Sequence, residues 1–336
     1  MKALCLLAPA LLVCAAPAFA NVTVSSPVNG ALVVSPFTLA ATASPCSAQP
    51  VAAMGYSFDN SSNTMIVNGS SVDAHVAGAV GAHVLHVKSW GNNGASCVAN
   101  VAITILPSPT SIIPSNAVAV TGIHTLKTWQ ASFDSATGGG SSTGTMRVVG
   151  SPSVSGTARE FLTTYTNYGG ERYSVLFGNN STATNFFYDT WIYPASPTND
   201  VANIEMDLNQ VMSNGETVIF GFQCDGWSGT WDYTTNAGTP QNPKDMWLHS
   251  TSSCNPRAWT TNTWHHVQIQ FSRDNQGNVT YHSVWFDGAE QEINATVPSA
   301  FALGWGPALL TNFQVDGIGG TGSAIVYLDN LTVYRW

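Results

Sequence analysis

The stretch Asn203-Ile204-Glu205-Met206-Asp207-Leu208-Asn209-Gln210 alternates strictly between apolar and polar residues from Ile204 to Asn209. A period of two is typical of a β-strand with one buried face. Ile204, Met206 and Leu208 then point into a core, while Glu205, Asp207 and Asn209 point the other way. Two neighbouring carboxyl groups are costly to bury without a base. The second face is therefore predicted to meet water, a metal ion, a partner or a substrate.

The first twenty residues have the layout of a secretory signal peptide. Met1-Lys2 precedes an apolar run, and Ala18-Phe19-Ala20 is a cleavage signal of the A-x-A type. A lipoprotein signal at Cys14 is disfavoured because Val13 is bulky. No apolar run is long enough to span a bilayer. We therefore expect a mature protein that starts at Asn21 and is secreted, periplasmic or exposed at the cell surface.

Four cysteines remain after removal of the signal: Cys46, Cys97, Cys224 and Cys254. An even number in an exported chain indicates disulfide bonds, and three pairings are open. We favour Cys46–Cys97 and Cys224–Cys254, because each bond then closes within one domain. Free buried thiols are the alternative.

Composition and turn signals divide the chain. Charged residues make up 9% and the net charge is −9, with no basic cluster, which argues against a nucleic-acid partner. Residues 21–106 read as short strands between turns, which predicts a small β-sandwich. Residues 107–120 form a Pro/Ser-rich linker. Residues 121–336 hold ten of the eleven tryptophans and no clear amphipathic helix, which predicts a larger sandwich.

The first domain resembles the immunoglobulin-like modules of bacterial exported proteins. Two segments carry the resemblance, Ser26-Pro27-Val28-Asn29-Gly30-Ala31 and Gly81-Ala82-His83-Val84-Leu85-His86-Val87-Lys88-Ser89-Trp90. Such modules serve many roles, so this fold does not fix a function. We expect a spacer or an accessory binding module.

The second domain resembles the concanavalin A-like lectin/glucanase superfamily. Its fold signals are Thr263-Trp264-His265-His266-Val267-Gln268-Ile269 with Val284-Trp285-Phe286-Asp287-Gly288, and the closing strand Val326-Tyr327-Leu328-Asp329-Asn330-Leu331-Thr332-Val333-Tyr334. Glu205-Met206-Asp207 resembles the acidic strand E-x-D-x-(x)-E of the jelly-roll glucanases. The resemblance implies an all-β chain, in which an immunoglobulin-like sandwich precedes a jelly-roll sandwich.

The resemblance to the glucanases implies that Glu205 is the nucleophile and that Asp207 assists it. The last acid of the motif is absent, because Asn209 or Gln210 stands in its place. A retaining mechanism needs a second carboxyl group about 5–5.5 Å from the first. Candidates for that acid elsewhere in the chain are Asp189, Asp225 and Asp232. The alternative is that Glu205 and Asp207 bind sugar hydroxyls without any chemistry.

Aromatic and amide side chains favour a glycan partner, because sugar faces stack on aromatic rings and hydroxyls bond polar groups. The alternative is that the tryptophans belong to the core and the polar faces to solvent. The predicted substrate-binding residues are Asp189, Trp191, Gln210, Asp225, Trp227, Trp231, His266 and Gln268. A further polar strand face comprises Asn312, Gln314 and Asp316.

No zinc spacing is present, and no cofactor is expected to be required. The resemblance implies a structural calcium ion at Asp329, and the alternative is a solvated side chain in a turn. We expect a monomeric exported protein, without a membrane span, that binds a polysaccharide, and whether it also hydrolyses that polysaccharide is left open by the sequence. The alternatives are a non-catalytic glycan-binding module and a surface adhesion protein.

Overall fold

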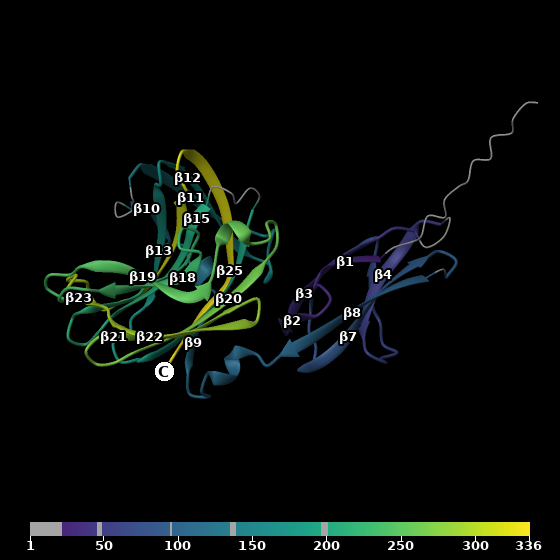
Figure 1. Cartoon of the computed structure of the whole chain (residues 1–336), viewed down its shortest axis with the longest axis horizontal. Coiled ribbons are helices and arrows are strands. Elements are labelled where there is room, and N and C mark those ends of the chain that lie inside the picture. The colour runs from purple at the N-terminus through teal and green to yellow at the C-terminus, as the bar shows by residue number, and fades with distance from the viewer. Residues whose placement is uncertain (1–21, 46–48, 95, 135–138, 196–200) are drawn as a thin grey trace, which may run out of the picture. The chain divides into compact units, whose positions relative to one another are not determined.

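The computed structural model describes residues 22–45, 49–94, 96–134, 139–195 and 201–336. The predicted signal peptide and Cys46 lie outside these residues. The chain divides into two compact units, one ending at Leu106 and the other starting at Pro107. Figure 1 shows strands connected by loops and short helical turns, so the predicted all-β fold is confirmed. Among the described residues, no helix is both long and apolar enough to cross a membrane.

The first unit is a sandwich of two sheets. Leu39, Met54 and Leu85 are fully buried in its core. Its immunoglobulin-like relationship stays a prediction. One sheet has the order β1 (Val22–Ser26), β3 (Phe37–Ala43) and β6 (Ser71–Val76). The other has the order β2 (Ala31–Val34), β8 (Ser96–Leu106), β7 (Gly81–Gly91), β4 (Val51–Phe58) and β5 (Met65–Asn68).

The second unit is a larger sandwich. Its nine-stranded sheet has the order β10 (Gln130–Asp134), β13 (Gly170–Gly178), β24 (Leu309–Gly317), β15 (Val201–Val211), β17 (Phe222–Asp225), β18 (Thr230–Asn236) and β19 (Asp245–Ser253), with β16 (Thr217–Phe220) and β23 (Ala300–Phe301) beside this path. Its eight-stranded sheet has the order β11 (Ser141–Val149), β12 (Ala158–Thr166), β25 (Thr321–Arg335), β14 (Asn185–Pro194), β20 (His265–Arg273), β21 (Asn278–Phe286) and β22 (Ala289–Pro298), with β9 (Val118–Val120) paired to β25.

The alternation of β15 places this strand as predicted. Ile204, Met206 and Leu208 belong to the hydrophobic core, where aromatic side chains of both sheets meet. Phe161 of β12 stacks on Phe313 of β24, with ring centroids 5.1 Å apart. Because this core takes the apolar face of β15, the polar face points away from it.

Part of the segment expected to be a linker is folded. Residues 109–112 form a short helical turn, η1 (Pro109–Ile112), and β9 adds to the eight-stranded sheet. Two further turns follow, η2 (Ile123–Thr125) and η3 (Pro256–Ala258). The backbone bonds of β9 with β25 explain why this stretch belongs to the second unit.

The predicted bond between Cys224 and Cys254 is confirmed. It joins β17 to the segment after β19 across a sequence separation of 30 residues. A loop of this length corresponds to about 4 kcal/mol of stabilisation in the loop-entropy account. The pairing of Cys46 with Cys97 stays a prediction, because Cys46 lies outside the described residues.

Candidate functional site

Glu205 lies at the centre of a row of polar residues that crosses the nine-stranded sheet. In the β-sheet register it is directly opposite Gln314 of β24 and Gln223 of β17. The row continues to Arg172 of β13 on one side and to Asp232 of β18 on the other. Residues directly opposite each other share a face, so all five side chains emerge on the face away from the core.

A second row runs beside the first. Asn203 is opposite Asp316 of β24 and Asp225 of β17, and the row reaches Asp134 of β10 through Gly170. This surface is recessed, since only 8% of Glu205 and 4% of Asp316 are exposed although they point away from the core. We call it the polar face. It comprises Asp134, Arg172, Asn203, Glu205, Asp207, Asn209, Gln223, Asp225, Asp232, Asn312, Gln314 and Asp316.

Amide side chains separate several of these carboxyl groups. Gln314 Nε2 donates to Asp134 Oδ2 and to Asp316 Oδ1, both at 3.0 Å. The Asn203 amide lies between Asp316 and Asp225, and with its nitrogen toward Asp225 it donates to Oδ1 at 2.6 Å. Burial, followed by the nearby charge of Asp134, raises the pKa of Asp316 to about 7. This carboxyl group is therefore about half protonated in neutral solution.

Glu205 and Asp207 share a side-chain hydrogen bond. Burial and the adjacent Asp207 raise the pKa of Glu205 far above its ordinary value. Burial also raises the pKa of Asp207, but Asp207 accepts from Glu205, from Asn312 Nδ2 at 3.4 Å and from Phe222 N at 3.2 Å. Glu205 therefore keeps the proton and Asp207 is the more acidic partner.

Asp225, Asp232 and His249 meet at one edge of the polar face. Their potential ligand atoms all lie within 4.8 Å of one another, an arrangement that could hold a metal ion. Hydrogen-bond donors already contact the carboxylates, however. Asp225 accepts from the backbone N–H groups of Trp227 and Ser228, and His249 Nδ1 lies 2.7 Å from Asp232 Oδ2. The cluster is therefore satisfied by its own hydrogen bonds.

Two exposed aromatic rings lie at the end of the polar face next to Asp225 and Asp316. Trp227, in the turn between β17 and β18, is 51% exposed, and Tyr168 is in the turn between β12 and β13. Their ring centroids are 6.2 Å apart. Tyr168 has φ +68°, a conformation that costs energy for a residue with a Cβ. It packs over Gly319, where a Cβ would lie 3.1 Å from the tyrosine ring.

Two predicted binding residues lie on the core side of the sheet and cannot reach the polar face. Trp231 is fully buried and stacks on Phe222 with centroids 5.3 Å apart. Gln210 follows Leu208 on the core face of a regular strand. It donates to the carbonyl groups of Asn180 and Ala183 and accepts from Arg273 Nε at 2.8 Å. Neither side chain reaches the polar face, which corrects the expectation that either one contacts a glycan there.

Four other predicted binding residues come together, but on the eight-stranded sheet. Asp189 Oδ1 lies 2.7 Å from His266 Nε2, and Gln268 Nε2 donates to Asp189 Oδ2 at 2.8 Å. Trp191 stacks on His266 at 4.3 Å. Asp189 is thus removed from the candidates for the acid that would act with Glu205.

Asp329, in β25 of the eight-stranded sheet, is held mainly by donors from the loop between β11 and β12. Its carboxylate accepts from the hydroxyl groups of Ser153 and Ser155 and from the N–H groups of Val154, Ser155 and Asn330, and it lies 3.3 Å from His124 Nε2. Although burial opposes it, these hydrogen bonds hold the pKa of Asp329 far below its ordinary value. A calcium ion would have to displace several of these donors, so calcium at Asp329 stays a prediction that the hydrogen bonding disfavours.

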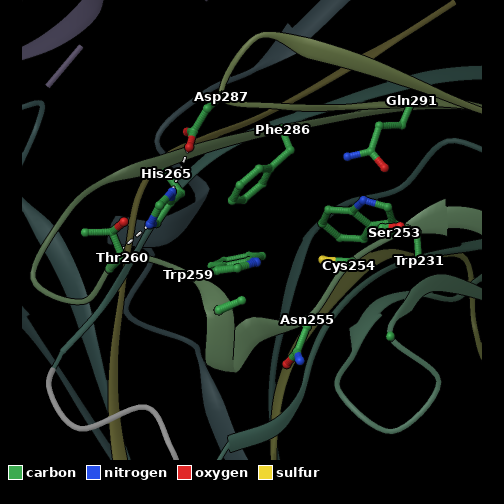
Figure 2. Close-up of a pocket in the computed structure, with 12 residues that line it drawn as sticks. Trp231, Ser253, Cys254, Asn255, Trp259, Thr260, His265, Phe286, Asp287 and Gln291 are labelled. Carbon is green, nitrogen blue, oxygen red and sulfur yellow. Dashed lines mark hydrogen bonds and ion pairs between the residues drawn. The ribbon is translucent and has the colours of Figure 1, made fainter. Parts of the chain in front are cut away.

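A cavity of about 410 Å³ opens on the core side of β18, separate from the polar face. Figure 2 shows Trp231, Trp259 and Phe286 among its walls, with His265 between Asp287 and Thr260. His265 Nδ1 lies 2.7 Å from Asp287 Oδ2, and Nε2 lies 3.0 Å from the Thr260 carbonyl oxygen. Burial lowers the pKa of His265, but these two acceptors outweigh it and the pKa is raised. The imidazolium form is therefore favoured here.

No family model matches the chain, and no curated protein matches it significantly. Solved structures similar to it include carbohydrate-binding modules of the β-sandwich superfamily, with 11% identity, 93% of this chain and 97% of the other covered and a TM-score of 0.34. The cellulose-induced protein Cip1 has 14% identity, 61% and 90% coverage and a TM-score of 0.37. A family 11 carbohydrate-binding module from Clostridium thermocellum has 12% identity, 64% and 94% coverage and a TM-score of 0.27. Similarities this remote do not define an activity.

Sequence reasoning missed part of the polar face. Asp134 was not singled out, and Asp316 was predicted as part of a separate polar strand face; both are far from Glu205 in sequence and reach it through the strand order β10-β13-β24-β15. The alternation of Asn312, Gln314 and Asp316 was the available signal for β24. For Tyr168, no signal distinguished it from an ordinary turn residue.

Proposed function

We propose that the polar face of the nine-stranded sheet binds a polysaccharide, and that the mature protein does so after export. Glycan sites combine aromatic rings for the sugar faces with polar groups for the hydroxyls. Here the amides and carboxyl groups follow the rows of Glu205 and Asn203, and Trp227 and Tyr168 lie in turns at the strand ends next to the Asn203 row. The observation that carries the proposal is this exposed aromatic pair beside recessed polar residues.

The test is a glycan array followed by calorimetry on the variant Trp227→Ala. Loss of a half-exposed indole that becomes buried on binding should weaken affinity by about 1–3 kcal/mol. Trp264→Ala is the matched control, because Trp264 packs against Tyr193 at the eight-stranded sheet. Unchanged affinity of Trp227→Ala for every bound glycan would remove the aromatic pair from the site. Absence of any glycan binding by the wild type would remove the proposal.

Hydrolysis is the second candidate function, and Asp316 favours it. The carboxyl groups of Glu205 and Asp207 share a hydrogen bond, so they are closer than the roughly 5–5.5 Å of a retaining pair. Asp316 lies diagonally across from Glu205 on the neighbouring strand, with a pKa of about 7 that suits a proton donor. Asp225 is also diagonal, but both of its oxygens accept backbone N–H groups. Asp232 is two strands away, roughly 10 Å at the usual strand spacing.

A reducing-sugar assay separates the two functions. If the protein hydrolyses a glycan, Glu205→Gln and Asp316→Asn should each lower turnover by orders of magnitude and leave the binding of an uncharged glycan nearly intact, because both groups act mainly in the transition state. Asp232→Asn is the matched control for a carboxyl group on the same face. A wild type that binds a glycan without cleaving it would leave binding as the function.

A further inference from the structure

The ionisable groups on the polar face are predominantly acidic. Carboxyl groups from five strands contribute to it, namely Asp134, Glu205, Asp207, Asp225, Asp232 and Asp316. The strands of the nine-stranded sheet contain two basic residues, Arg172 and His249. His249 is the partner of Asp232 at the edge of the sheet. Arg172 is thus the remaining basic residue on the strands of this sheet, and Arg257, whose guanidinium donates to the Gly226 carbonyl, lies beside the turn that holds Trp227.

The carboxyl groups of the polar face interact electrostatically with one another. Besides burial, the nearby Asp207, Asp316 and Asp134 raise the pKa of Glu205. The nearby Asp225 also raises the pKa of Asp316 and that of Asp232. Neighbouring like charges in a recessed site cannot all ionise unless protons or an external cation offset them. A ligand that brings positive charge would therefore interact with several of these groups at once.

An unsatisfied donor on the same face points independently to a ligand. Asn209 follows Asp207 on the polar side of β15 and is only 2% exposed. Within the part of the chain that the structure describes, its Nδ2 has no hydrogen-bond partner. Buried amide donors normally find an acceptor. A hydroxyl or ring oxygen of a sugar is an acceptor of the required kind, whereas a bare metal ion is not.

We propose that the polar face prefers a polysaccharide whose sugar units carry free amino groups and discriminates against glycans with carboxylate or sulfate groups. This inference rests on the proposed function, since it specifies the substrate class of the same surface. Ammonium groups donate hydrogen bonds to the carboxylates and offset their charge, while sugar oxygens meet Asn209. An acidic glycan would meet six carboxyl groups on this surface, with Arg172 as the basic residue on its strands.

The first experiment compares ligands. Calorimetry of the mature wild-type chain, in near-neutral low-salt buffer, would use three hexasaccharides: a glucosamine hexamer, the N-acetylglucosamine hexamer of the same linkage, and a uronic-acid hexamer. The glucosamine hexamer should bind at least tenfold more tightly than its acetylated form. This advantage should shrink in high salt, because exposed charges are screened. The uronic-acid hexamer should bind most weakly.

The second experiment locates the preference with variants of equal formal charge change. Asp316→Asn should reduce the advantage of the glucosamine hexamer several-fold. Glu292→Gln, on exposed β22 of the other sheet, should leave it unchanged. If thermal unfolding shows that Asp316→Asn is misfolded, Asp225→Asn replaces it. Both variants keep the size of the side chain.

Three outcomes would overturn the inference in different ways. Equal or tighter binding of the acetylated hexamer would contradict the preference and leave polysaccharide binding standing. An advantage that Asp316→Asn and Asp225→Asn leave unchanged would place the amine site elsewhere. If no hexamer and no other glycan binds, the proposed function fails together with this inference.

Discussion

The outward faces of the two sheets in the second unit both carry carboxyl groups, but they balance them differently. On the eight-stranded sheet each central acid has a base. Asp189 lies 2.7 Å from His266, and Glu160 accepts from Arg147 at 2.7 Å. On the nine-stranded sheet, Glu205 instead contacts another acid, Asp207.

The central carboxyl groups of the eight-stranded sheet are paired with bases, whereas those of the nine-stranded sheet neighbour one another. A carboxylate with a nearby base is already neutralised, so it contributes to the structure and has little to offer a ligand. Recessed acids that neighbour one another keep raised pKa values, and such groups gather at functional sites. The eight-stranded sheet therefore contains a structural cluster, and the nine-stranded sheet contains the candidate site.

The largest effect is expected from Asp316→Asn at alkaline pH. Burial raises the folded-state pKa of Asp316 to about 7, above the unfolded value, so the folded state binds more protons between these two pKa values. Stability contributed by this group is full at low pH and is lost as the pH rises toward 7 and beyond, at about 1.4 kcal/mol per unit of pKa difference. The variant should therefore lose less stability from acid to alkaline pH. Denaturant unfolding followed by tryptophan fluorescence measures this, and parallel pH profiles would contradict it.

A smaller effect, which is a loss of stability, is expected from a substitution on the eight-stranded sheet. His266→Leu leaves Asp189 without its base, which should lower the free energy of unfolding by about 1–3 kcal/mol at neutral pH. His266→Gln is the control, because its amide can still donate to Asp189 and should lose less. Denaturant unfolding of the two variants checks the order. Glycan binding should be unchanged in both, and a loss of binding would mean that this cluster also contacts the ligand.

The smallest effect is expected from the exposed pair of Arg147 and Glu160. Arg147 is largely solvent-exposed, so its removal should barely change stability, and high salt should abolish even that difference. Unfolding of Arg147→Ala at low and high salt gives the comparison. A large, salt-independent loss would show that the outer surface of this sheet contributes more than ion pairing.

The alternation of apolar and polar residues was sufficient to predict which side chains of β15 belong to the polar face. Alternation alone assigned Glu205 and Asp207 to one face, because side chains on a strand have a period of two. The same rule, applied strictly, places Gln210 with Leu208 on the core side, so only a bulge could have brought it beside Glu205. The structure has a regular strand there.

Residues distant in sequence could not be placed in the same way. Trp227 and Trp231 lie in one Gly-rich stretch, yet one is exposed and the other fully buried. What separates them is the pairing of Trp231 with Cys224 across β17 and β18. Likewise, Asp316 became a neighbour of Glu205 only through the order of strands in the sheet, which depends on tertiary packing rather than on local sequence.

Every one of the eleven residues of β15 is buried, on both faces of the strand. Its backbone amides should consequently exchange with deuterated solvent only when the whole unit opens. A bound glycan would then slow exchange very little at Glu205 itself. Its footprint should be sought in the turns that hold Tyr168 and Trp227, because exposed turns open more readily than buried strands and a bound ligand can slow their exchange.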